Sequence, residues 1–83
     1  MFADPLPGMI EAVRCVLRDP ELEVQPDDVL DDLAGWDSIN LIALVVEAEC
    51  RFAVEFRAED IEGLVTIGDI MRAIEAKRAL ASA

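Results

Sequence analysis

The chain has no histidine, no tyrosine and only two cysteines among its 83 residues. Without histidine, zinc sites and most general-base chemistry lose their commonest side chain. The two cysteines, Cys15 and Cys50, have neither metal-site spacing nor the pattern of a disulfide framework, so we expect free thiols. Basic residues are also scarce, at 7 against 18 acidic ones, for a formal net charge of −11. This balance argues against a nucleic-acid partner, which requires a basic patch, and favours a basic protein surface.

Long apolar runs are missing too. No segment approaches the length that spans a membrane, and the N-terminus lacks the basic region of a signal peptide. We therefore expect a soluble cytoplasmic protein without membrane contact. Hydrophobic residues make up 54% of the chain, so it should fold, as a single domain over residues 1–83. Residues 1–6 and 79–83 are expected to be disordered or frayed.

The most informative segment is 35–52, which reads as a turn followed by one helix. Asp37 and Ser38 are both good N-cap residues. If Asp37 is the cap, Ser38 takes the first helical position and its hydroxyl is left free.

A helical wheel drawn at about 100° per residue gives this helix two apolar faces. The first is an ordinary core stripe of Leu41, Leu44, Val45, Ala48 and Phe52. The second, nearly opposite, comprises Ile39, Ile42, Ala43, Val46 and Cys50. Either the chain encloses this second face, or a partner covers it.

The flanking segments complete an all-α fold, a small four-helix bundle. A first helix is expected from about Pro7 to Arg18, with core residues Ile10, Val13 and Leu17 and a buried thiol at Cys15. The loop over residues 19–37 carries eight acidic side chains, without the pattern of a calcium loop, and includes one helical turn around Asp28–Leu33. Its apolar residues Leu22, Val24, Leu30 and Leu33 should pin it to the core. Trp36 is either exposed or covers part of the core.

Two more helices follow. A short helix over Ala58–Glu62 should stop at Gly63. Thr66 should cap the last helix, with Asp69 completing an imperfect capping box. Its core residues are Ile67, Ile70 and Ile74.

The run Asp37-Ser38-Ile39, after Gly-Trp and before an apolar helix that ends in Glu-Ala-Glu-Cys-Arg-Phe, resembles acyl and peptidyl carrier proteins of the free-standing type. Segments 52–56, 59–61 and 66–70 also look like this family, and the likeness runs from about Ile10 to Ile74. Ile39 stands where leucine is usual.

The resemblance implies that Ser38 carries a covalent 4′-phosphopantetheine arm derived from coenzyme A. Asp37 would contribute to metal binding when a phosphopantetheinyl transferase installs the arm; the protein itself has no metal site. From local residues alone, both could instead be plain helix caps. The helix after the serine is the docking surface in this family, which assigns that role to Asp37, Ile39, Ile42, Val46, Glu47 and Glu49.

Such a protein is a monomeric carrier that delivers acyl or aminoacyl thioesters to loading and condensing enzymes with basic docking surfaces. Asn40 and Ala43 stand where carriers of fatty-acid synthesis commonly have acids, which favours polyketide or nonribosomal peptide assembly. The alternative is a small helical adaptor that is never modified, or that dimerises through its second apolar face. An enzyme is disfavoured, because no nucleophile–base pair or phosphate loop is present.

Overall fold

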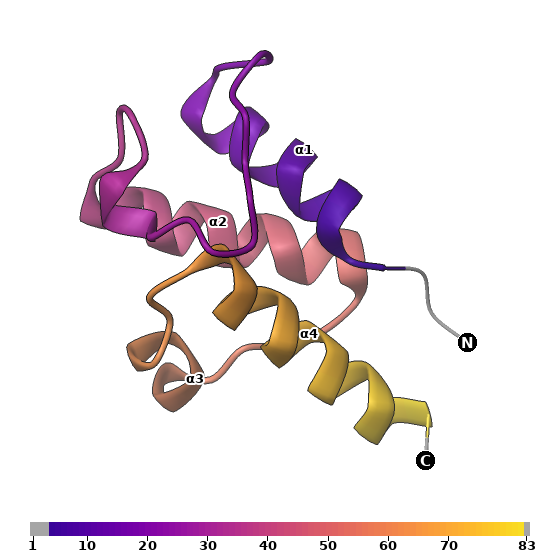
Figure 1. The fold of residues 1–83 in the computed structure, drawn as a ribbon. Coiled ribbons are helices and arrows are strands. Elements are labelled where there is room, and N and C mark those ends of the chain that lie inside the picture. Colours follow the sequence, from indigo (N-terminus) through magenta and orange to yellow (C-terminus); the bar gives the residue numbers. More distant parts are fainter. Residues whose placement is uncertain (1–3, 83) are drawn as a thin grey trace.

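The computed structural model describes the backbone of residues 4–82 and the side chains of residues 4–80. Its helices are α1 (Leu6–Leu17), α2 (Ser38–Phe52), α3 (Ala58–Glu62) and α4 (Ile67–Ser82), with a single 3₁₀ turn η1 (Leu30–Asp32) between α1 and α2 (Figure 1). Over the described residues there is no β-strand, only an isolated bridge between Val29 and Thr66. The predicted all-α bundle of three longer helices and one short one is confirmed. No helix in this part of the chain is both long and apolar enough to cross a membrane.

The core lies between α1, α2 and α4. α1 packs along α2, and α4 closes the third side (Figure 1). The fully buried side chains are Met9, Ala12 and Val13 of α1, Leu44 and Ala48 of α2, and Ile67, Ile70 and Ile74 of α4. The core stripe predicted for α4 is therefore confirmed, as are Leu44, Val45 and Ala48 of the stripe predicted for α2. On α1 the buried face is rotated from the predicted one: Met9 and Ala12 lie at its centre, while Ile10 and Leu17 lie only at its margin.

Helix ends follow local sequence. Arg18 and Ala53 adopt left-handed backbone conformations directly after α1 and α2, which ends each helix. At the start of α4 the Thr66 hydroxyl accepts a bond from the Asp69 N–H, and the Asp69 carboxylate accepts one from the Thr66 N–H, at 3.1 and 3.0 Å. The predicted capping box is confirmed. α1 begins at Leu6 and α4 continues to Ser82. Residues 1–3 and 83 lie outside the described part.

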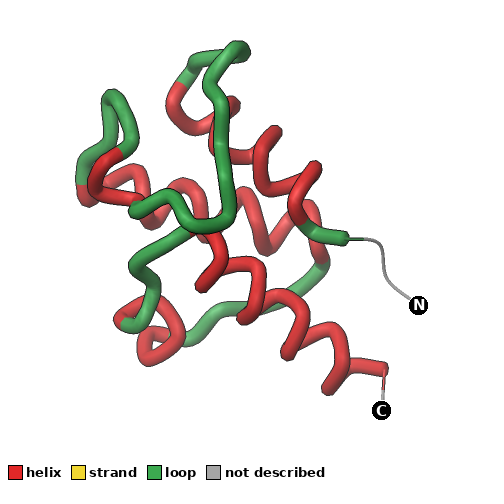
Figure 2. The backbone as a smooth tube through the Cα atoms, in the orientation of Figure 1, coloured by secondary structure: helices red, strands yellow, loops and turns green. Residues whose placement is uncertain are grey.

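The loop over residues 18–37 is tied to the beginning of α4. The N–H of Gly68 donates to the Pro26 carbonyl at 2.7 Å, and the N–H of Ile67 donates to the Asp28 carbonyl at 3.1 Å. Further along, the Leu30 N–H donates to the Val65 carbonyl at 2.9 Å. Figure 2 shows the loop descending from the end of α1 to this junction before it turns back toward α2. Together with the buried side chains of Val24 and Leu30, these bonds explain why a strongly acidic segment lies fixed on the core.

The short helix α3 is held by charged side chains. The Asp60 carboxylate accepts the N–H of Arg57 at the start of α3 and also binds the Lys77 ammonium of α4 at 2.7 Å. These bonds lower the pKa of Asp60, the hydrogen bond from Lys77 being the main cause. The same ammonium lies 5.3 Å from the centre of the Phe56 ring. α3 therefore depends on α4 for its position.

Two side-chain expectations need correction. Cys15 was expected to be a buried thiol, but both cysteines are exposed. Cys15 lies two residues, or about 200°, beyond the buried Val13 around α1, so the helix directs it outward. Phe52 was placed within the core stripe, but its ring is only half-buried, at the edge of the core.

Candidate functional site

Ser38 is the first residue of α2. Asp37 is the N-cap: its Oδ1 accepts the backbone N–H of Ile39 at 2.9 Å and that of Asn40 at 3.3 Å. Asp37 thus performs the capping that Ser38 could otherwise have performed. Ser38 is exposed, and among the described residues its hydroxyl makes no hydrogen bond. The structure therefore presents a free hydroxyl at the head of a 15-residue helix.

The electrostatics at this end of α2 suit a phosphodiester. A helix N-terminus carries partial positive charge from aligned peptide dipoles and favours a nearby anion. The cap bonds use one oxygen of Asp37, and its carboxylate is exposed beside Ser38. An exposed carboxylate next to the hydroxyl is the kind of group that can bind a divalent cation held by a second protein.

A cavity of about 150 Å³ adjoins Ser38. Its lining comprises Leu30, Asp31, Trp36, Ser38, Leu41, Leu64 and Val65. Apart from Asp31 and Ser38 these residues are apolar, and the indole of Trp36 packs against the core rather than standing free. Of the two positions left open for Trp36, the structure shows the one that covers the core. A flexible chain attached to Ser38 could lie along this apolar lining, so the surroundings fit a phosphopantetheine arm.

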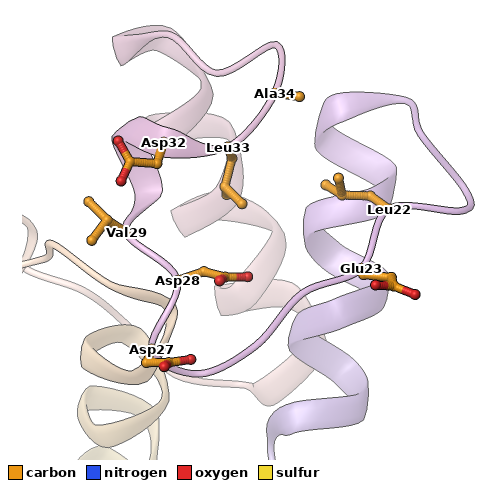
Figure 3. A pocket seen from close by; sticks show the side chains of 8 residues that line it. All are labelled: Leu22, Glu23, Asp27, Asp28, Val29, Asp32, Leu33 and Ala34. Carbon is orange, nitrogen blue, oxygen red and sulfur yellow. The ribbon is translucent and has the colours of Figure 1, made fainter.

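A larger cavity of about 380 Å³ lies away from Ser38, within the acidic loop. Figure 3 shows it between the loop segment that carries Leu22 and Glu23 and the segment 27–34. Acidic side chains, among them Asp28 and Asp32, share its lining with leucines. However, no group of three or more His, Cys, Asp or Glu side chains in the described residues is arranged to hold a metal ion. This cavity therefore gives no support for a metal site.

The second apolar face of α2 is exposed. Ile39, Ile42 and Val46 are 75%, 55% and 52% exposed, respectively. They lie on the same helix as Ser38 and begin at the next residue, so they form a continuous apolar surface beside the hydroxyl. We call these three residues the apolar face of α2. Two alternatives were left open for this face, and the described part of the chain does not enclose it.

The two glutamates expected at its edge have partners inside the protein. Glu47 binds Arg51, one turn further along α2, at 2.7 Å, and this bond raises the pKa of Arg51. Arg51 also reaches Glu11 of α1 at 3.3 Å. Glu49 accepts the backbone N–H of Phe56 at 2.8 Å and so fixes the link to α3. Their carboxylates are less available than the exposed ones of Asp31 and Asp37.

Sequence reasoning missed two residues at this site. Asn40 was considered only as an uncharged residue at a position where carriers of fatty-acid synthesis commonly have acids, but its side-chain amide donates to the carbonyl of Gly35 at 3.1 Å. The signal that could have found it is its place at the third helical position, from which a polar side chain can bond to the residues before the helix. Val65 was given no role, but it is 56% exposed and lines the cavity beside Ser38. No local pattern would have found it, because a loop between α3 and α4 brings it there.

Comparison with known proteins agrees with this geometry. Residues 8–74 match the family described as phosphopantetheine attachment site. The acyl carrier protein of Acidothermus cellulolyticus is 33% identical over 64 residues, which are 77% of this chain and 76% of that protein. The meromycolate extension acyl carrier protein of Mycolicibacterium aurum is 29% identical over 68 residues, or 82% of this chain and 70% of the relative.

The fold also matches a solved structure. The solution structure of holo acyl carrier protein from Geobacter metallireducens superposes with a TM-score of 0.83 at 22% identity, covering 95% of this chain and 91% of that one. The family match includes α2 and α3 entirely, α1 except its first two residues, and the first half of α4. Members of this family are carriers and not enzymes, and the group they carry is attached covalently. The chain belongs to the acyl carrier protein family, and its cofactor is 4′-phosphopantetheine.

Proposed function

We propose that Ser38 is the residue to which the phosphopantetheine arm is attached. The observation that carries this proposal is the exposed hydroxyl of Ser38 at the first position of α2, free because Asp37 has taken over the cap. The chain contains one other serine, Ser82, at the end of α4. Attachment at Ser38 places the arm beside both the apolar face of α2 and the cavity lined by Trp36 and Leu41.

The apolar face of α2 serves as the centre of a transient docking surface. Three large aliphatic side chains exposed in a row form a patch that a partner can bury. Val65 extends this patch across the cavity next to Ser38. The partner is an enzyme with an apolar recess surrounded by basic residues, because the carboxylates of Asp31 and Asp37 border the attachment end. Glu47 and Glu49 contribute at the other end through their charge, although each already has an internal partner.

The pathway served is polyketide or nonribosomal peptide assembly, with the protein acting as a free-standing monomer in the cytoplasm. Support comes from α2 itself: Asn40 and Ala43 are uncharged, so the exposed side of the helix carries few free acids. A net charge of −11 opposes association of two copies through the same face. Partner enzymes would be a phosphopantetheinyl transferase and enzymes that load and condense acyl or aminoacyl groups.

Intact-mass measurement tests the attachment directly. Incubation with coenzyme A, magnesium and a phosphopantetheinyl transferase should add one phosphopantetheine to the wild type and to Ser82→Ala, and none to Ser38→Ala. Circular dichroism should show equal helicity in all three, because the Ser38 hydroxyl makes no hydrogen bond with any residue that the structure describes. Modification of Ser38→Ala would place the arm elsewhere, and no modification of the wild type by several transferases would favour an unmodified adaptor.

The pathway is tested separately with the phosphopantetheinylated protein. Acyl transferases and aminoacyl-activating enzymes of polyketide and nonribosomal peptide assembly are compared with a malonyl transferase of fatty-acid synthesis as loading partners. We expect kcat/KM to be higher with an enzyme of the first group. A clear preference for the fatty-acid enzyme would overturn the pathway proposal and leave the attachment proposal intact.

A further inference from the structure

The turn that leads into α2 has an unusual backbone. Gly35 adopts φ +81°, in the left-handed region that side chains other than glycine rarely occupy. A Cβ placed there would meet nothing within 4 Å, so glycine is needed for conformation and not for space. The next residue, Trp36, donates its N–H to the Leu33 carbonyl at 3.1 Å. The direction in which the chain enters α2 therefore depends on a small number of hydrogen bonds in this turn.

Asn40 supplies one of these bonds from within the helix. Its Nδ2 donates to the Gly35 carbonyl at 3.1 Å, and its backbone N–H donates to the Asp37 carboxylate at 3.3 Å. The same residue therefore holds the turn on both sides of the cap. Ser38 lies between the cap residue Asp37 and Asn40.

We propose that Asn40 is a positioning residue for Ser38: by tying Gly35 to the first turn of α2, it fixes the orientation in which the hydroxyl meets the transferase. This inference rests on the proposed attachment at Ser38. The bond spans five residues and encloses both Trp36 and Ser38. If it is lost, the turn can rotate at Gly35, whose backbone is the most permissive in the segment.

The chemistry of the side chain explains why an amide is needed. A carbonyl oxygen can only accept, so the residue that holds Gly35 must donate a proton, and a carboxylate cannot. An acid at this third helical position instead accepts a bond from the N–H of the cap residue and interacts favourably with the helix dipole. Asn40→Asp should therefore release Gly35 while leaving α2 as stable as before or more stable. This variant separates positioning from folding.

The experiment measures phosphopantetheinylation kinetics of the intact protein at varied carrier concentration for wild type, Asn40→Asp and Asn40→Ala. One hydrogen bond of this kind corresponds to a change of roughly 2–10-fold. We expect kcat to fall by that factor in both variants. KM should be unchanged in Asn40→Ala, and unchanged or lower in Asn40→Asp, because the added carboxylate attracts a basic partner. Melting temperature should not fall in Asn40→Asp. Trp36 is the only tryptophan, and a soluble quencher should quench its fluorescence more in both variants.

A second perturbation of the same turn provides a check. Gly35→Ala strains the backbone at φ +81° without a clash. Because both changes act on one turn, the loss in kcat of the double variant Gly35→Ala/Asn40→Ala should be smaller than the product of the single losses.

Three results would overturn the inference. The first is a kcat equal to that of the wild type in both Asn40 variants. The second is an increase in KM with no change in kcat. The third is a lowered kcat with unchanged quenching of Trp36, which would mean that Asn40 contacts the transferase directly. Failure of the proposed function is distinguishable. If wild-type Ser38 is never modified, that proposal fails, and this inference fails with it.

Discussion

Val45 and Val46 are neighbours on α2, but Val45 is 4% exposed and Val46 is 52% exposed. The turn of about 100° per residue between them places one on the core side and the other on the apolar face of α2. The pair therefore provides a matched test of docking.

Val46→Asp should fold with a melting temperature close to that of the wild type and should be loaded much more slowly by its cognate enzyme, because the new charge lies at the centre of the proposed docking surface. Val45→Asp should unfold the protein, because it buries an unpaired charge. Loading of the wild type should weaken as salt rises. If Val46→Asp is loaded normally, the docking surface lies elsewhere.

The Phe52 ring lies between two other elements. A Cβ on Gly8 of α1 would come within 2.7 Å of the ring carbon Cζ, and the Arg78 guanidinium of α4 lies 4.9 Å from the ring centre. Because the ring is only half-buried, Phe52→Ala should lower the free energy of unfolding by about 2–3 kcal/mol, below the value for a fully buried ring. Urea denaturation measures this change. A melting temperature within a few degrees of the wild type would contradict it.

The close contact at Gly8 gives a second prediction. Gly8→Ala should cost about 1–2 kcal/mol, because the added methyl group displaces the ring. In a Phe52→Leu background this cost should largely disappear, since the atoms that would clash are gone. Urea denaturation measures the loss of unfolding free energy caused by Gly8→Ala in each background. An equal loss in both would show that contact with the Phe52 ring is not what disfavours a side chain at position 8.

Gly68 and Gly63 provide a matched pair at the start of α4 and the end of α3. A Cβ on Gly68 would come within 2.9 Å of the Pro26 carbonyl oxygen, whereas one on Gly63 would be 3.9 Å from the nearest atom. We expect Gly68→Ala to destabilise the protein by about 1–3 kcal/mol, because a backbone atom cannot move aside as a side chain can. Gly63→Ala should have little effect. Hydrogen exchange should also show the loop around Pro26 loosened only in Gly68→Ala.

The Asp69 carboxyl makes the stability of the folded protein depend on pH. Bonds from the backbone N–H groups of Thr66 and Val65, and an ion pair with Arg72, lower the pKa of the Asp69 carboxyl. A lowered pKa in the folded state stabilises the protein above the unfolded value of about 3.9, and that contribution is lost as pH falls through the folded pKa. Wild type should therefore exceed Asp69→Asn in stability at pH 5–7, and urea denaturation should show the difference shrinking below about pH 4. A difference that is the same at pH 3 and pH 7 would exclude ionisation as its origin.

The periodicity of α2 and α4 predicted their buried faces, because 3.6-residue spacing depends on local sequence alone. The exposed apolar face was predicted in the same way. Local sequence could not show that Glu49 is used by the Phe56 N–H or that Asp60 binds Lys77, since both depend on how α3 is placed. The outward position of Cys15 was open to the same reasoning, because Cys15 lies two residues, or about 200°, beyond the core residue Val13 of α1.

The bonds that join residues 26–30 to residues 65–68 have a consequence for the order of folding. They connect segments far apart in the chain, and such contacts form late because the intervening loop must close first. During synthesis, α2 and Ser38 emerge before the residues that anchor the loop leading into them. A chain interrupted before α4 would contain the serine and its helix but not the anchored loop. For a transferase that requires the ordered turn, the arm would be added only to chains that have finished folding.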